Sequence, residues 1–137
     1  MRRLRGSLLG LALLAGPAAG GAGALEPLAD NPRVRSEFLA AAIGDEISKN
    51  CPTISARLFR ALHMARELER YALGLGYTEE DIRAMRKDPA AKALLERRRD
   101  AYLSANGAVE GDPDSYCRLG REEIATKTLT GRLLRAR

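Results

Sequence analysis

The pattern of apolar and polar positions is helical over most of this chain. Between residues 32 and 50 the apolar side chains recur at the spacing that places them on one face of an α-helix: Val34, Phe38, Ala42, Ile43 and Ile47. A clearer amphipathic stretch follows between residues 54 and 75, with apolar residues at Ile54, Leu58, Ala61, Leu62, Ala65, Leu68, Ala72 and Leu75. No stretch alternates with a period of two, so the pattern predicts helices and no strands.

Proline, glycine and capping residues predict helix boundaries that agree with this period. Three pairs combine a capping Asn or Asp with a proline at the first helical position: Asn31-Pro32, Asp88-Pro89 and Asp112-Pro113. Thr78 and Asp81 fit a capping box, while Gly76 and Gly107 fit left-handed helix ends. We therefore predict an all-α fold, a small single-domain bundle of about five helices.

The first 24 residues have the composition of an export signal. A positive start at Arg2, Arg3 and Arg5 precedes a short apolar core and the small residues Ala22-Gly23-Ala24, which signal peptidases cut. The alternative is a retained membrane anchor, but a spanning helix needs about 20 mostly apolar residues, and glycines and Pro17 interrupt this stretch. We predict a cleavable secretory signal peptide at residues 1–24 and export to the periplasm. A flexible leader over 25–32 and a helical domain over 33–137 would follow.

The net charge of the mature chain is small. The whole chain has 23 Lys+Arg against 18 Asp+Glu, a net of +5, but three of the arginines lie in the predicted signal. The remaining 20 basic and 18 acidic residues leave a net of +2. With no tryptophan and few aromatic residues, the mature chain also lacks a stacking platform, so the composition argues against nucleic-acid binding.

The chain has two cysteines, Cys51 and Cys117. In an exported protein with only two cysteines a disulfide is the default, and this one would close the bundle with a loop of about 67 residues, worth about 4 kcal/mol. The alternatives are a redox pair or two free buried thiols. A redox pair usually has a Cys-x-x-Cys spacing, which these residues lack.

No combination of residues amounts to a catalytic, cofactor or metal site. His63, the only histidine, lies four residues before Glu67, and two ligands are not a zinc site. The adjacent carboxylates Asp45-Glu46 and Glu122-Glu123 point about 100° apart on helices and make no acid–base pair. Arg98 lies on an apolar stripe at the predicted edge of the core, as a candidate ligand for a phosphate or carboxylate.

Three segments, two of which contain a cysteine, resemble a known family. Residues 42–62, 73–82 and 114–135 are similar to the small exported bacterial proteins grouped as domain of unknown function 5333. The matching positions are Cys51, Ile54, Ser55, Arg57 and Leu58, then Tyr116, Cys117, Leu119, Gly120, Arg121, Glu123, Ile124, Leu133, Leu134 and Arg135. The resemblance implies no activity. It does imply an association with a respiratory membrane complex, since some members are encoded beside subunits of the proton-pumping NADH:quinone oxidoreductase.

Two groups of polar residues are candidates for binding. Arg57, Arg121 and Glu123 form a candidate polar cluster, in which Arg57 pairs with Glu123 across two helices or the two arginines line an anionic-ligand pocket. The basic residues near the C-terminus are candidate contact residues, either for an acidic protein surface or for anionic headgroups, and alternatively they complement the negative end of the last helix: Arg132, Arg135 and Arg137.

These observations predict an exported, non-enzymatic accessory or binding protein of the cell envelope, without a cofactor. We expect a protein partner in the envelope, no nucleic acid, and at most a peripheral contact with the membrane. The alternative is a small periplasmic enzyme, such as an envelope hydrolase, in which carboxylates from different helices converge, for example Glu46 with Glu123.

Overall fold

The computed structural model describes residues 24–137, so the predicted signal peptide lies almost wholly outside the described residues. Within that range the chain folds into six α-helices, one 3-10 turn and two short strands. In chain order these are η1 (Leu28–Asp30), α1 (Pro32–Asn50), β1 (Ile54–Ala56), α2 (Leu58–Gly74), α3 (Glu79–Lys87), α4 (Pro89–Ala105), α5 (Pro113–Thr126), α6 (Leu129–Arg132) and β2 (Leu134–Ala136). The predicted all-α class is confirmed, apart from the small sheet.

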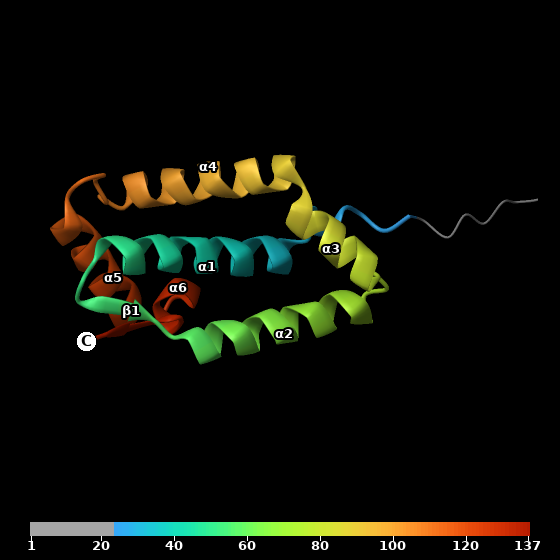
Figure 1. The fold of residues 1–137 in the computed structure, drawn as a ribbon, viewed down its shortest axis with the longest axis horizontal. Coiled ribbons are helices and arrows are strands. Elements are labelled where there is room, and N and C mark those ends of the chain that lie inside the picture. The colour runs from blue at the N-terminus through green and yellow to red at the C-terminus, as the bar shows by residue number, and fades with distance from the viewer. Residues whose placement is uncertain (1–23) are drawn as a thin grey trace, which may run out of the picture.

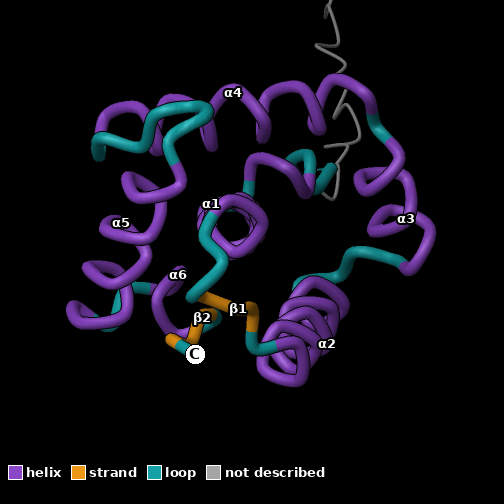
Figure 2. Tube along the Cα trace, turned by 60° about the vertical axis from the view of Figure 1, so that its left-hand side comes forward, coloured by secondary structure: helices purple, strands orange, loops and turns teal. Residues whose placement is uncertain are grey.

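Helix α1 is the centre of the molecule. Figure 2 shows it nearly end-on, with α4, α5, α6, α2 and α3 arranged around it. Its apolar stripe is consequently buried at Val34, Ile43 and Ile47. Burial of this stripe against several neighbours contributes to the hydrophobic driving force that holds the helices together.

The predicted helix boundaries follow from local capping. The side chain of Asn31 accepts hydrogen bonds from the backbone N–H groups of Arg33 and Val34 at the start of α1. Thr78 and Asp81 form the predicted capping box at the start of α3. Gly76 has a φ of 98°, the left-handed conformation expected of a glycine that ends a helix.

The disulfide prediction is confirmed. Cys51 ends α1 and Cys117 lies in α5, with their sulfur atoms 1.99 Å apart and their Cα atoms 5.0 Å apart. Both cysteines are buried in the main core cluster beside Ile47 and Leu119. The bond therefore joins the central helix to α5 at the end of the molecule where the sheet lies (Figure 1).

The prediction that the chain contains no strand is wrong. Residues 54–56, which we expected to begin the second helix, pair antiparallel with residues 134–136, in the register Ile54↔Ala136, Ser55↔Arg135 and Ala56↔Leu134. Ile54 and Leu134 bury their side chains from this sheet. Strands of three residues are too short to show a period, and this pairing joins two distant segments, so no local pattern indicated it.

Helix α2 is amphipathic as predicted, but the first half of its apolar face is not covered. Only Leu68 and Ala72 are buried in it. Leu58 is 75% exposed and Leu62 is 48% exposed, and Phe59 next to them is 92% exposed. The start of α2 therefore presents large apolar side chains to the surface instead of the core.

Candidate functional site

Three of the predicted candidate residues gather at the sheet end of the molecule. Arg57 follows β1, Arg132 ends α6, and Arg135 lies in β2. They line one hollow of about 470 Å³ together with two further basic residues, Arg60 and Lys127. We call these five residues and the surface between them the basic hollow.

The charges of the basic hollow are not compensated. Among the described residues, none of its five cations has a carboxylate oxygen within 4 Å, whereas some exposed cations elsewhere do, such as Lys49 with Asp45 at 2.5 Å. The remaining ion pairs of the described residues also lie outside the hollow. Several like charges around one concavity produce a local positive potential.

Two of these arginines are held in place through their Nε atoms. Arg135 Nε donates to the hydroxyl of Ser55 at 3.2 Å, and Arg132 Nε donates to the backbone carbonyl of Lys127 at 3.1 Å. Neither bond uses the terminal NH₂ groups of the guanidinium. Those groups form the planar fork that binds carboxylates, so the arrangement suits an anionic group.

A second hollow adjoins the basic one and has an apolar wall. It has a volume of about 560 Å³ and shares Arg57, Arg60 and Arg135 with the basic hollow. Its other lining residues include Leu58 and Phe59, which we call the apolar pair. Phe59 is 92% exposed beside these arginines, and aromatic residues and arginine are the types enriched at protein interfaces.

The other candidate arginines lie elsewhere. Arg137 follows β2, and its backbone N–H donates a hydrogen bond to the backbone carbonyl oxygen of Thr53 at 2.8 Å. Arg121 is exposed on α5 and lines neither hollow. Arg98 is half-buried on α4 and lines a separate pocket with α1 and α3. Arg57 and Arg121 therefore do not form one anionic-ligand pocket.

The predicted ion pair between Arg57 and Glu123 is not formed. Glu123 is only 3% exposed, and its two carboxylate oxygens accept hydrogen bonds from the hydroxyls of Tyr102 and Thr128. Burial, and then the bond to Glu123, raise the pKa of Tyr102 to about 12. Glu123 therefore ties α4 to the turn between α5 and α6, a structural role.

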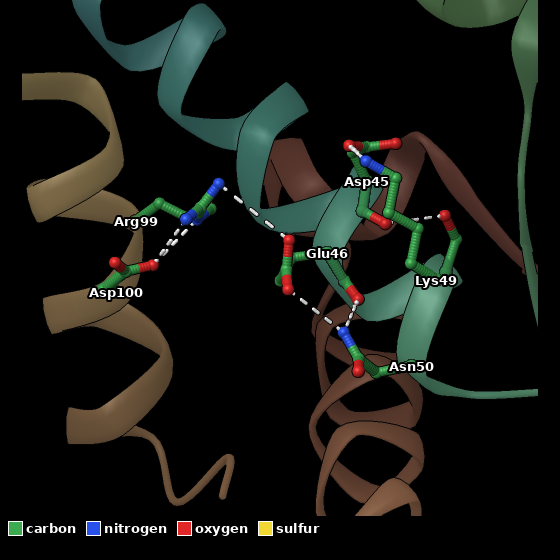
Figure 3. A network of polar contacts seen from close by, with 7 residues as sticks. Asp45, Glu46, Lys49, Asn50, Arg99 and Asp100 are labelled. Carbon is green, nitrogen blue, oxygen red and sulfur yellow. Dashed lines mark hydrogen bonds and ion pairs between the residues drawn. The ribbon is translucent and has the colours of Figure 1, made fainter. Parts of the chain in front are cut away.

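Glu46, the other carboxylate of the enzyme alternative, belongs to a different network (Figure 3). Its side chain accepts a hydrogen bond from Asn50 at 3.1 Å and lies 3.9 Å from Arg99, which also pairs with Asp100 at 2.8 Å. The partners of Glu46 are Asn50 and Arg99, whereas those of Glu123 are Tyr102 and Thr128, so the two carboxylates have no partner in common. The structure thus gives the two carboxylates separate structural partners.

His63 does not belong to a metal site in the described part of the chain. Its Nε2 lies 3.9 Å from a carboxylate oxygen of Glu67, which also bonds to Arg70. Within residues 24–137 no three His, Cys, Asp or Glu side chains are placed to hold a metal ion. None of the helices in that range is long and apolar enough to span a membrane.

Sequence reasoning missed Arg60, Lys127 and the apolar pair. One local signal was present, because Phe59 falls outside the apolar stripe that Leu58 and Leu62 follow. A large aromatic residue on the polar face of an amphipathic helix is not expected to pack into the core.

The fold and this surface define a small helical domain, closed by a disulfide, with an uncompensated basic hollow beside an exposed apolar pair. The chain belongs to a family of unknown function, DUF5333, whose sequence profile matches residues 26–135. The resemblance found in the two cysteine blocks is thereby confirmed. No curated protein and no solved structure matches the chain.

Proposed function

We propose that this protein is an exported, non-enzymatic accessory protein of the cell envelope that binds an acidic partner protein through the basic hollow and the apolar pair. The observation that carries the proposal is the position of five unpaired cations around one concavity beside two exposed large apolar side chains. Arginine and aromatic residues are the types enriched at protein interfaces.

The shape of the surface favours a protein partner over a lipid bilayer. Two adjoining hollows receive side chains, whereas a bilayer offers a broad surface without projections. Burial of Phe59 or Leu58 by a partner is worth about 1.5–3 kcal/mol each. Complementary charge around them would increase the rate of association and select the partner. A respiratory membrane complex, approached from its outer face, is the first candidate.

Export is supported by the disulfide between Cys51 and Cys117, because such bonds persist in oxidising compartments. The signal at residues 1–24 supplies the route. Protein purified from the native periplasm should begin at Leu25. An N-terminal sequence that still contains Arg2 and Arg3 would contradict export by signal cleavage.

Site-specific crosslinking tests the partner. A photoreactive residue placed at Phe59 should crosslink one envelope protein in cells, and the same residue at Val109, which is 56% exposed on another part of the surface, should not. Equal products from both positions would contradict a contact at the apolar pair.

A matched pair of charge variants tests the basic hollow. The triple variant Arg57→Gln/Arg132→Gln/Arg135→Gln should lose the crosslink at position 59, and the wild-type interaction should weaken as salt is raised. The control Arg66→Gln/Arg97→Gln/Arg121→Gln removes the same charge from exposed residues outside the hollow and should retain it. Equal losses in the two variants would contradict the proposal. If only vesicles with anionic lipid bind, and they bind through the hollow, the partner is a membrane and the protein partner is excluded.

A further inference from the structure

A smaller pocket lies away from the basic hollow, near the end of the molecule where α1 and α4 begin (Figure 1). It has a volume of about 140 Å³, and its wall is made mainly of apolar side chains from α1, α3 and α4. These include Val34, Phe38, Met85, Leu94 and Leu95. The pocket is therefore an apolar recess between three helices.

The charged residues that line this pocket all carry the same sign. They are Arg35, Arg86, Lys92 and Arg98, and no Asp or Glu is among the lining residues. Arg86 lies 3.7 Å from a carboxylate oxygen of Glu69. Among the described residues, the other three have no ion-pair partner within 4 Å. Arg98 is half-buried, the state expected of an arginine whose stem packs on an apolar wall.

We propose that this pocket binds a small amphiphilic carboxylate, with its apolar body between the helices and its carboxylate on Arg98. The pocket has about the volume of a cavity that accommodates benzene, so its apolar wall has room for a five-carbon chain or a single ring. Arg98 supplies a planar fork for the carboxylate, and Arg35 and Lys92 add positive charge at the same pocket.

Both features of the pocket are needed to select this class of ligand. An inorganic anion would bind the cations but make no contact with the apolar wall. A neutral hydrocarbon would contact the wall but make no ionic contact with the cations. A carboxylate with an apolar body uses both. The pocket shares no lining residue with the basic hollow, so this proposal is independent of the proposed function.

Three probes separate the two features: hexanoate, its neutral analogue hexanol, and acetate, which keeps the carboxylate without the body. Each is titrated into the mature protein while backbone amide NMR signals are followed. Hexanoate should give saturable shifts confined to α1, α3 and α4, with a Kd about tenfold lower than that of either control.

The variants Arg98→Gln and Arg97→Gln complete the test. Arg97 is the adjacent residue, is exposed and does not line the pocket, so it controls for net charge. Arg98→Gln should raise the Kd for hexanoate about tenfold, and Arg97→Gln less than twofold, in proteins with unchanged spectra without ligand. Equal binding of hexanol and hexanoate, equal binding of acetate and hexanoate, equal effects of the two variants, or no saturable shift would each overturn the proposal.

Discussion

Ser55 and Arg135 lie directly opposite each other in the two-stranded sheet, and the serine hydroxyl accepts a hydrogen bond from Arg135 Nε at 3.2 Å. The two residues are 80 positions apart in the chain. The bond restrains the Arg135 side chain at the edge of the basic hollow. It uses only the Nε atom, so the two terminal NH₂ groups of Arg135 do not take part in it. The sheet therefore orients one of the cations that we propose for partner binding.

Removal of the Ser55 hydroxyl should weaken partner binding without unfolding the protein. In Ser55→Ala, Arg135 has to be ordered on binding, which costs about 0.5–1.5 kcal/mol and lowers the affinity about two- to tenfold. The control Ser36→Ala removes a hydroxyl that bonds to a backbone carbonyl on the exposed side of α1. Crosslinking yield at position 59 as a function of concentration measures the difference. An unchanged yield in Ser55→Ala would show that the restraint on Arg135 has no role in binding.

Loss of the disulfide should strongly destabilise the domain. Cys51 and Cys117 are 66 positions apart, and a bond that closes a loop of this size restricts the unfolded chain by about 4 kcal/mol on the chain-entropy model. The double variant Cys51→Ser/Cys117→Ser should therefore unfold at a much lower urea concentration. Free thiols in the folded, non-reduced wild type would contradict the assignment.

Gly131 should not tolerate a side chain. A Cβ atom there would lie 1.8 Å from the backbone carbonyl oxygen of Glu123, so α6 can pack against α5 only with glycine at this position. Gly131→Ala should cost about 3 kcal/mol or more. It should also displace Arg132 and Arg135 from the basic hollow.

Gly74 provides the matched control for this substitution. It lies within α2, and a Cβ atom there meets nothing within 4 Å. Gly74→Ala should leave stability unchanged or increase it by up to about 1 kcal/mol. Urea unfolding of both variants measures the contrast, and similar losses in the two proteins would contradict close packing at Gly131.

Stability should fall at alkaline pH because of Tyr102. Burial and the bond to Glu123 raise its pKa from 10.0 to about 12 in the folded state. The unfolded chain therefore loses this proton first, so the contribution is complete below pH 10 and is lost as the pH rises toward 12. In Tyr102→Phe the urea midpoint should therefore decline less steeply than in the wild type as the pH rises from about 10 to about 12. Parallel declines in the two proteins would contradict the raised pKa.

The positions of the helices were predictable because their signals are local. A capping side chain such as Asn31 bonds to backbone N–H groups two and three residues away. The apolar period of α1 likewise predicted which of its faces is buried. The disulfide was predictable for another reason, since only one pair of cysteines is available. These features depend on neighbours in the chain or on composition, and both can be read without coordinates.

The candidate binding surface was predictable only in part. Arg57, Arg132 and Arg135 were candidates, but for different sites, and Arg57 was expected to pair with Glu123. Glu123 instead accepts bonds from Tyr102 and Thr128, which satisfy its oxygens within the core. No sequence pattern distinguishes a carboxylate that pairs with arginine from one that pairs with two hydroxyls, because the choice depends on which groups the packing brings near.

The sequence by itself thus determined five of the six helices of the described residues, the ends that a capping residue or glycine marks, the covalent link and the family. Only the tertiary structure decided that residues 54–56 pair with residues 134–136, that the first half of α2 leaves Leu58 and Phe59 exposed, and that five cations line one hollow. The physical reason is the range of the interactions. A cap or a helical period acts within a few residues, whereas sheet pairing, uncovered apolar surface and uncompensated charge depend on which distant segments meet when the chain packs.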